Sequence, residues 1–137
     1  MIIERVPCPC CGYPTLPAHC EWEICVLCNW EDDGQTDIDA DRVRGGPNGK
    51  YSLTQARENY NKYLVMYSPD NDTRIMPGTW PGELDIKRAL INYFEELKTA
   101  DDESIKQSLW QEILKLEDKL HSITSEKIKE YESRLKR

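Results

Sequence analysis

Two cysteine-containing stretches, CPCCGY at residues 8–13 and ICVLCNW at residues 24–30, decide how this chain folds. Each stretch contains a pair of cysteines separated by two residues, and thirteen residues lie between the two pairs. Two such pairs can supply four thiolates at tetrahedral geometry around one zinc ion, and the intervening residues suit a short hairpin. The spacing therefore predicts a zinc site. Its expected ligands are Cys8, Cys11, Cys25 and Cys28.

The expected zinc is structural, because an ion ligated by four thiolates has no open position for a reacting water molecule. A redox dithiol is the competing interpretation, but it is typical of a single pair at a strand-to-helix turn, and no βαβ pattern adjoins these cysteines. The two remaining cysteines are interpreted as small buried side chains. Alternative ligands of a shifted site are Cys10, His19 and Cys20.

The length and charge of the chain limit the classes of function that it can have. The chain has 137 residues, a net charge of −7 and a pI near 4.9, so we expect one domain with an appendage and no general binding of nucleic acid. The N-terminal residues carry no signal-peptide pattern, and no apolar run approaches the length of a membrane span. We therefore expect a cytoplasmic protein, in which six clustered cysteines serve as metal ligands or redox thiols rather than disulfides.

A long polar loop follows the second cysteine pair and ends in GGPNG at residues 45–49. The spacing of its aspartates resembles the first half of a calcium loop, but Arg42 stands where that loop needs glycine. A weak divalent-metal site and a solvated acidic loop both remain open. The candidate partner-binding residues of this region are Trp30, Glu31, Asp32, Asp33, Asp37, Asp39, Asp41 and Asn48.

Helical patterns occupy the rest of the chain. Ser52 and Gln55 have the offset of a capping box and predict a helix over about residues 52–68. A second helix is expected to include Pro81 in its first turn, and a third to follow a cap at Asp101 or Asp102. A break in the third helix near Thr124 is left open. We expect these two helices to form a hairpin, with an intermolecular coiled coil, and hence a homodimer, as the alternative.

The predicted fold class is therefore α+β. A small zinc-ribbon-like N-terminal unit, a short β-hairpin with two cysteine knuckles, is expected to pack on α-helices and to precede a C-terminal helical hairpin. The expected domains are residues 1–80, which include the first helix, and residues 81–137.

Four blocks of sequence carry a family resemblance: CPCCGY, ICVLCNWEDDGQ, GGPNG and SLTQARENY, in this order. Over about residues 6–80 the chain resembles the bacterial cysteine-rich CPCC domain family. The resemblance implies a small zinc-ribbon-like protein and carries no established activity with it. It also implies a shared site made by the four paired cysteines, the block at residues 30–33 and the turn at Asn48.

Three classes of function follow from these patterns. The first is a zinc-stabilised protein-binding module, more narrowly an immunity or antitoxin-like protein, whose acidic loop binds a basic protein partner. The second is a divalent-metal-dependent hydrolase or nuclease that uses the loop carboxylates, although the chain has only two histidines and none of the common phosphate-loop or hydrolase motifs. The third is a zinc-ribbon accessory protein that binds nucleic acid, which the sparse basic residues around the cysteines disfavour.

Overall fold

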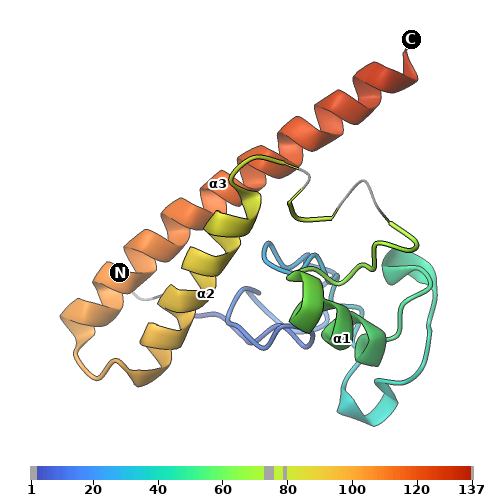
Figure 1. Ribbon diagram of the computed structural model, residues 1–137. Helices are drawn as coiled ribbons and strands as arrows, with labels where there is room; N and C mark the ends of the chain where they lie inside the picture. Colours follow the sequence, from blue (N-terminus) through green and yellow to red (C-terminus); the bar gives the residue numbers. More distant parts are fainter. Residues whose placement is uncertain (1–2, 73–75, 79, 137) are drawn as a thin grey trace. The chain divides into compact units, whose positions relative to one another are not determined.

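A computed structural model describes residues 3–72, 76–78 and 80–136. The chain divides into two compact units, residues 1–79 and 80–137 (Figure 1). Over the described ranges, no helix has the length and apolar character that crossing a bilayer requires. The helical elements, in chain order, are the 3₁₀ turns η1 (Asp37–Asp39) and η2 (Gly46–Asn48) and the helices α1 (Leu53–Tyr63), α2 (Glu83–Thr99) and α3 (Glu103–Leu135).

The prediction of an α+β fold with a β-hairpin is wrong. Among the described residues the structure is helical and has no β-strand, and the only extended pairings are two isolated antiparallel bridges, Val6 with Leu16 and Ile24 with Glu31. Left-handed backbone conformations at Cys20 and Trp22, with φ of 57° and 60°, interrupt the segment before the second bridge. A ladder needs consecutive extended residues on both sides, so this pairing cannot lengthen into a hairpin.

Helix α1 begins where its capping box predicts. The Ser52 side chain accepts a hydrogen bond from the Gln55 amide at 3.0 Å, and the Gln55 side chain accepts one from the Ser52 amide at 3.1 Å. The predicted extension to Ser68 is wrong, because Leu64 adopts a left-handed conformation with φ of 61°. Its amide donates to the Tyr60 carbonyl at 2.8 Å and closes the helix.

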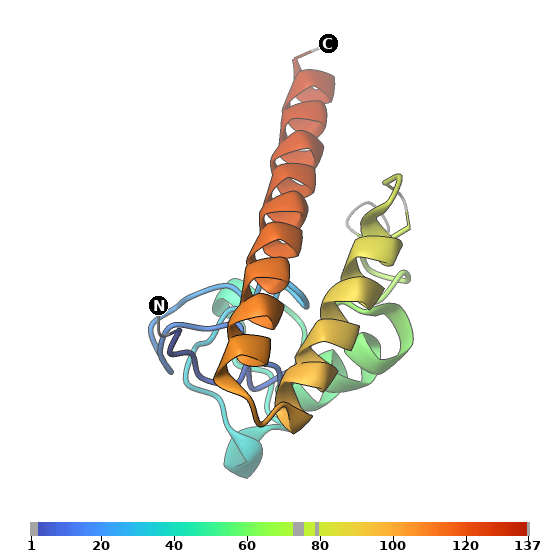
Figure 2. The same ribbon diagram turned by 90° about the vertical axis from the view of Figure 1, so that its left-hand side faces the viewer.

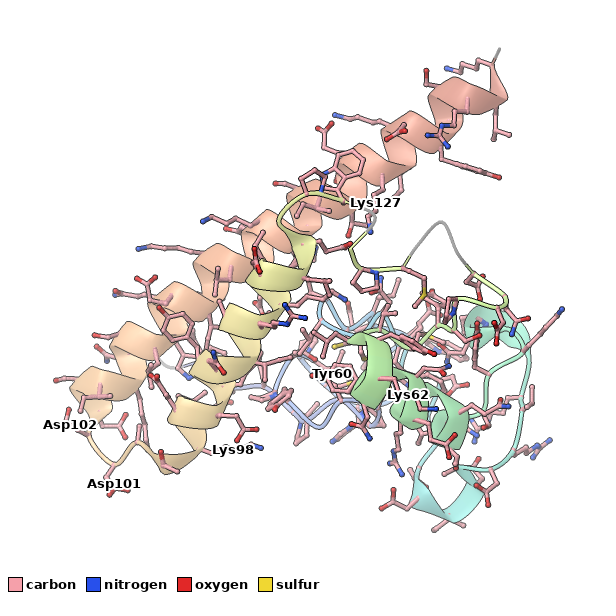
Figure 3. The ribbon with its side chains drawn as sticks, in the orientation of Figure 1. Tyr60, Lys62, Lys98, Asp101, Asp102 and Lys127 are labelled. Carbon is pink, nitrogen blue, oxygen red and sulfur yellow. The ribbon has the colours of Figure 1, made fainter. Side chains whose placement is uncertain are left out.

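The core of the first unit gathers around one face of α1. Leu53 and Ala56 are fully buried there, and Tyr60 is almost so, whereas Lys62 on the same helix is exposed (Figure 3). Burial of each large apolar side chain stabilises a fold by about 1.5–3 kcal/mol. The further buried apolar side chains of this unit include Leu16, Leu27, Trp30, Val65 and Met66.

The second unit is a pair of antiparallel helices, α2 and α3, which lie side by side in both views (Figures 1 and 2). Gly82, with φ of 82°, precedes α2, so Pro81 lies outside the helix that was expected to contain it. Asp102 caps α3 by accepting hydrogen bonds from two amides of the first turn, at 2.7 and 3.2 Å. From Glu103 the helix continues for 33 residues, so there is no break near Thr124.

Apolar packing and a partly buried ion pair join α2 to α3. Leu90 and Phe94 of α2, together with Ile113 of α3, are fully or almost fully buried. Lys127 of α3 donates to both carboxylate oxygens of Glu83 in the first turn of α2, at 2.7 and 2.8 Å (Figure 3). The apolar stripe of α3 therefore packs within the chain over the length of α2.

Candidate metal centre

The two cysteine pairs lie in two turns that repeat one backbone pattern. In the first turn the Cys8 amide donates to the carbonyl five residues later, that of Tyr13, at 2.9 Å, and the Gly12 amide donates back to the Cys8 carbonyl at 2.8 Å. In the second turn, the amides of Cys25 and Asn29 make the equivalent bonds at 2.9 and 2.8 Å. The two turns therefore form two cysteine knuckles with the same backbone hydrogen-bonding pattern.

Both knuckles end on a left-handed residue directly after the second cysteine. These residues are Gly12, with φ of 81°, and Asn29, with φ of 72°. Glycine adopts this conformation without steric cost, and asparagine tolerates it better than most residues do. Cys10 in the first knuckle occupies the position of Leu27 in the second, and both side chains are buried. Cys10 therefore fills an apolar position of the repeated turn, outside the four-sulfur group.

The four paired sulfurs converge. The Sγ atoms of Cys8 and Cys28 are 3.6 Å apart, those of Cys11 and Cys25 are 3.7 Å apart, and all four lie within 4.8 Å of one another. A tetrahedral ion with bonds of about 2.3 Å to sulfur requires sulfur–sulfur separations of about 3.8 Å. All six cysteines are free thiols. The residues present therefore fit a four-coordinate metal ion, and these four cysteines are placed to bind one.

Hydrogen bonds concentrate on one of the four sulfurs. Cys25 Sγ accepts from the Thr15 hydroxyl at 3.0 Å and from the Cys28 amide at 3.5 Å. Burial raises the pKa of Cys25, but hydrogen bonds from the neighbouring thiols and from Thr15 outweigh that effect and hold it well below its usual value. The pKa of Cys11 is raised, first by its hydrogen bond to Cys25. The pKa values of Cys8 and Cys28 are raised as well, so the fold by itself stabilises the thiolate, the form that binds a metal, at Cys25 alone.

Helix α1 and the segment after it position the two knuckles. Arg57 Nε of α1 donates to the Pro9 carbonyl in the first knuckle at 2.9 Å. The Met66 amide donates to the Cys28 carbonyl in the second knuckle at 2.8 Å. The chain beyond the cysteines is therefore part of the frame that holds them, so formation of the centre and folding of the first unit are coupled.

Two of the alternative ligands, His19 and Cys20, lie beside Asp32. His19 Nδ1 lies 3.7 Å from Asp32 Oδ2, and the Cys20 amide donates to that same oxygen at 2.9 Å. The Cys20 side chain is exposed and lies against Gly34, where an added Cβ would come within 2.7 Å of its sulfur. The structure thus places both residues around the Asp32 carboxylate and outside the four-sulfur group.

The first candidate partner-binding residues are inside the fold. Trp30 is fully buried, Asp32 is 1% exposed and Asp33 is 7% exposed. The Asp32 carboxylate accepts from the amides of Cys20 and Gly34, and Asp33 Oδ1 accepts from the Gln35 amide at 3.1 Å. These two aspartates therefore satisfy backbone donors of their own loop and of Cys20, which precedes the second knuckle.

The three later aspartates are each paired separately. Asp37 binds Arg57 of α1 at 2.6 Å, and Asp39 binds Arg44 at 2.6 Å. Asp41 Oδ1 accepts from the hydroxyl of Thr54 at 2.6 Å. The pKa of Asp39 is lowered, first by a hydrogen bond from the Thr36 amide and then by Arg44. Within the described ranges, the four-cysteine cluster is the single group of His, Cys, Asp and Glu side chains placed to hold a metal.

The side chain of Asn48 is hydrogen-bonded to the backbone of Glu31. The Asn48 side chain is buried, accepts from the Glu31 amide at 3.0 Å and donates to the Glu31 carbonyl at 2.8 Å. It thereby ties the GGPNG turn to the segment after the second knuckle. Sequence reasoning missed two other polar residues of this frame, Thr15 and Gln35. Gln35 is buried, and its side-chain Nε2 donates to two loop carbonyls at 2.7 and 2.6 Å.

Comparison with known proteins assigns the cysteine-rich unit. Residues 6–77, more than half of the chain, match the family model described as "Cysteine-rich CPCC". Neither the curated proteins nor the solved structures contain a match to this chain.

Proposed function

Since the chain belongs to the cysteine-rich CPCC family, we propose that it is a protein-binding module whose fold is stabilised by one zinc ion. The observation that carries the metal part of this proposal is the convergence of four cysteine sulfurs within 4.8 Å of one another. Thiolate ligands in a tetrahedral arrangement favour zinc among the divalent ions of cells. The ligands that would hold the ion are Cys8, Cys11, Cys25 and Cys28.

The zinc would be structural. Four sulfur ligands fill a tetrahedral coordination shell, so no position is left for a water molecule or a substrate. Binding of a structural zinc ion contributes about 10–16 kcal/mol, as much as the whole stability of an ordinary domain. Such a contribution suits a unit in which two irregular turns replace a sheet. Because its six cysteines are free thiols, we place the module in a reducing compartment such as the cytoplasm.

The partner would be a basic protein. The chain has a net charge of −7, and acidic groups accelerate association with a basic surface. An immunity or antitoxin-like protein is a narrower form of this proposal. The hydrolase or nuclease alternative has less support, because the loop carboxylates are hydrogen-bonded or ion-paired separately rather than gathered around a common point. Nucleic-acid binding has the least support, since the chain carries no large basic excess.

The metal part of the proposal is tested by elemental analysis of the purified chain. We expect one zinc ion per chain, and loss of both the zinc and the cooperative thermal unfolding in Cys25→Ser. Cys20→Ser is the matched control, because the Cys20 thiol is exposed and outside the cluster. A Cys25→Ser protein that retained stoichiometric zinc would contradict the proposal.

The partner part is tested by affinity capture followed by reconstitution with the purified candidate. We expect a single stoichiometric protein whose association with the zinc-loaded chain weakens as ionic strength rises, because screening reduces attraction between opposite charges. Association that is indifferent to salt would argue against a basic partner, and turnover of a metal-dependent substrate by the pure chain would favour the hydrolase instead.

A further inference from the structure

The segment before the second knuckle presents two large apolar side chains to solvent. Trp22 is 58% exposed and Ile24 is 57% exposed, and residues 19–24 are exposed throughout. This contrasts with the tryptophan of the same knuckle, Trp30, which is fully buried. Tryptophan is the residue type most enriched at the energetic centres of protein interfaces. An exposed tryptophan two residues before an exposed isoleucine is therefore a candidate for such a centre.

The backbone around these side chains is fixed. The Trp22 amide donates to the Asp32 carbonyl at 3.1 Å, and the Asp32 amide donates to the Glu23 carbonyl at 3.0 Å. Ile24 forms its bridge with Glu31, so these two residues are direct neighbours across the pairing. Cys25, a member of the four-sulfur cluster, follows Ile24 directly. The apolar pair is thus presented from a hydrogen-bonded turn, which limits the ordering cost of binding.

Three acidic residues that have no ion pair among the described residues adjoin the apolar pair along the chain and across the bridge. Glu21 and Glu23 alternate with Trp22 and Ile24 along the chain and are exposed, and Glu31 is half-buried. In the part of the chain that the structure describes, none of these three carboxylates forms an ion pair, in contrast to the loop aspartates bound by Arg44 and Arg57. Acidic charge that the fold itself does not neutralise is therefore available here to an external partner.

We propose that Trp22 and Ile24, rimmed by Glu21, Glu23 and Glu31, form the docking surface of this protein. Its occupant is a basic polypeptide that offers an apolar pocket bordered by lysine or arginine side chains. The assignment rests on the proposed function and moves the binding surface away from the buried residues of the acidic loop. Trp22 would supply the apolar anchor, and the three carboxylates would orient and accelerate the encounter.

A randomised short-peptide library, displayed on phage and selected against the zinc-loaded full chain, supplies the probe. Affinities of the enriched peptides are then measured by fluorescence anisotropy for wild type and for two surface variants, Trp22→Ala and the double variant Glu21→Gln/Glu23→Gln. Ile38→Ala is the apolar control, since Ile38 is 98% exposed. The double variant Glu58→Gln/Asp70→Asn removes the same charge from exposed positions elsewhere in the unit. Zinc content and circular dichroism verify that each variant is folded.

The expected peptides combine an aromatic or aliphatic residue with several lysines or arginines. Trp22→Ala should weaken them by at least about tenfold, as for an interface anchor. The Glu21/Glu23 variant should weaken them mainly at low salt. Both control variants should stay within about twofold of wild type, as is usual for surface changes outside an interface.

Three results would overturn the assignment. Peptides that bind Trp22→Ala as tightly as wild type would refute the proposed docking surface but not the proposal of a protein-binding module. Failure to enrich any peptide on the zinc-loaded chain would count against both. A dimer of the chain that Trp22→Ala dissociates, seen by sedimentation, would make this face a contact between two copies instead.

Discussion

Replacement of Thr15 by valine tests how the fold tunes its metal ligands. The Thr15 hydroxyl donates to Cys25 Sγ at 3.0 Å, and the side chain is 8% exposed. Valine has nearly the shape of threonine but no hydroxyl, so Thr15→Val removes this hydrogen bond with little change in packing. Water has poor access to take its place.

The size of the effect follows from the charge on the acceptor. A hydrogen bond to a charged group contributes about 1.5–3 kcal/mol. Since about 1.4 kcal/mol corresponds to a factor of ten in an equilibrium constant, complete loss would weaken zinc binding by about 10- to 150-fold. Loss of a residue that hydrogen-bonds a metal ligand typically costs about 10- to 100-fold in affinity, which covers most of the same range.

The assay is competition for zinc against a chromophoric chelator of known affinity, at fixed pH and ionic strength. Thr15→Ser is the matched variant, because serine keeps the hydroxyl and loses only a methyl group. We expect Thr15→Ser to stay much closer to wild type than Thr15→Val does. Equal zinc affinity of Thr15→Val and wild type would refute the argument that this hydroxyl stabilises the Cys25 thiolate.

Three further changes test other parts of the fold. Ser52→Ala removes the cap of α1 and should cost about 1 kcal/mol in urea unfolding, and no loss would contradict a role for the capping box. Lys127→Met leaves the buried Glu83 carboxylate without its partner and should lower the free energy of unfolding by about 3–5 kcal/mol. Adding Glu83→Gln to this variant should restore part of the loss. An unchanged urea midpoint in Lys127→Met would count against a role for the pair. Burial raises the pKa of Tyr60, so its neutral hydroxyl favours the folded state fully below about pH 10 and less as the pH rises further. Tyr60→Phe should therefore flatten the alkaline loss of unfolding free energy, and an unaltered pH profile would contradict this.

Local signals in the sequence predicted the ends of elements that short-range hydrogen bonds determine. The capping box at Ser52 and the cap at Asp102 both lie where the sequence indicated. The end of α1 did not follow from its apolar spacing, because the helix is closed by the left-handed conformation of Leu64, an unusual residue for that position. The expected β-hairpin failed for a similar reason, since left-handed residues interrupt the extended pairing.

The cysteine spacing predicted which four sulfurs come together, because each knuckle is a local turn. Whether the carboxylates of the acidic loop are free or paired depends on contacts between distant residues, so it could not be predicted from the composition of the loop. Asp37 is paired by Arg57 from the following helix, and the buried Asp32 accepts from the amide of Cys20, which precedes the second knuckle, as well as from that of Gly34. A run of carboxylates that looked available in the sequence is thus largely used within the fold. The exposed Trp22 carries no sequence signal that distinguishes it from the buried Trp30.

The repeated knuckle also has a consequence for the order of biosynthesis. All four cysteines of the cluster precede α1, so a ribosome completes this set before it has made α1, α2 or α3. A metal ion could therefore bridge the two knuckles while the rest of the chain is still being translated. The amide of Met66 and the side chain of Arg57, which join the knuckles later, would then dock onto a turn pair that is already assembled.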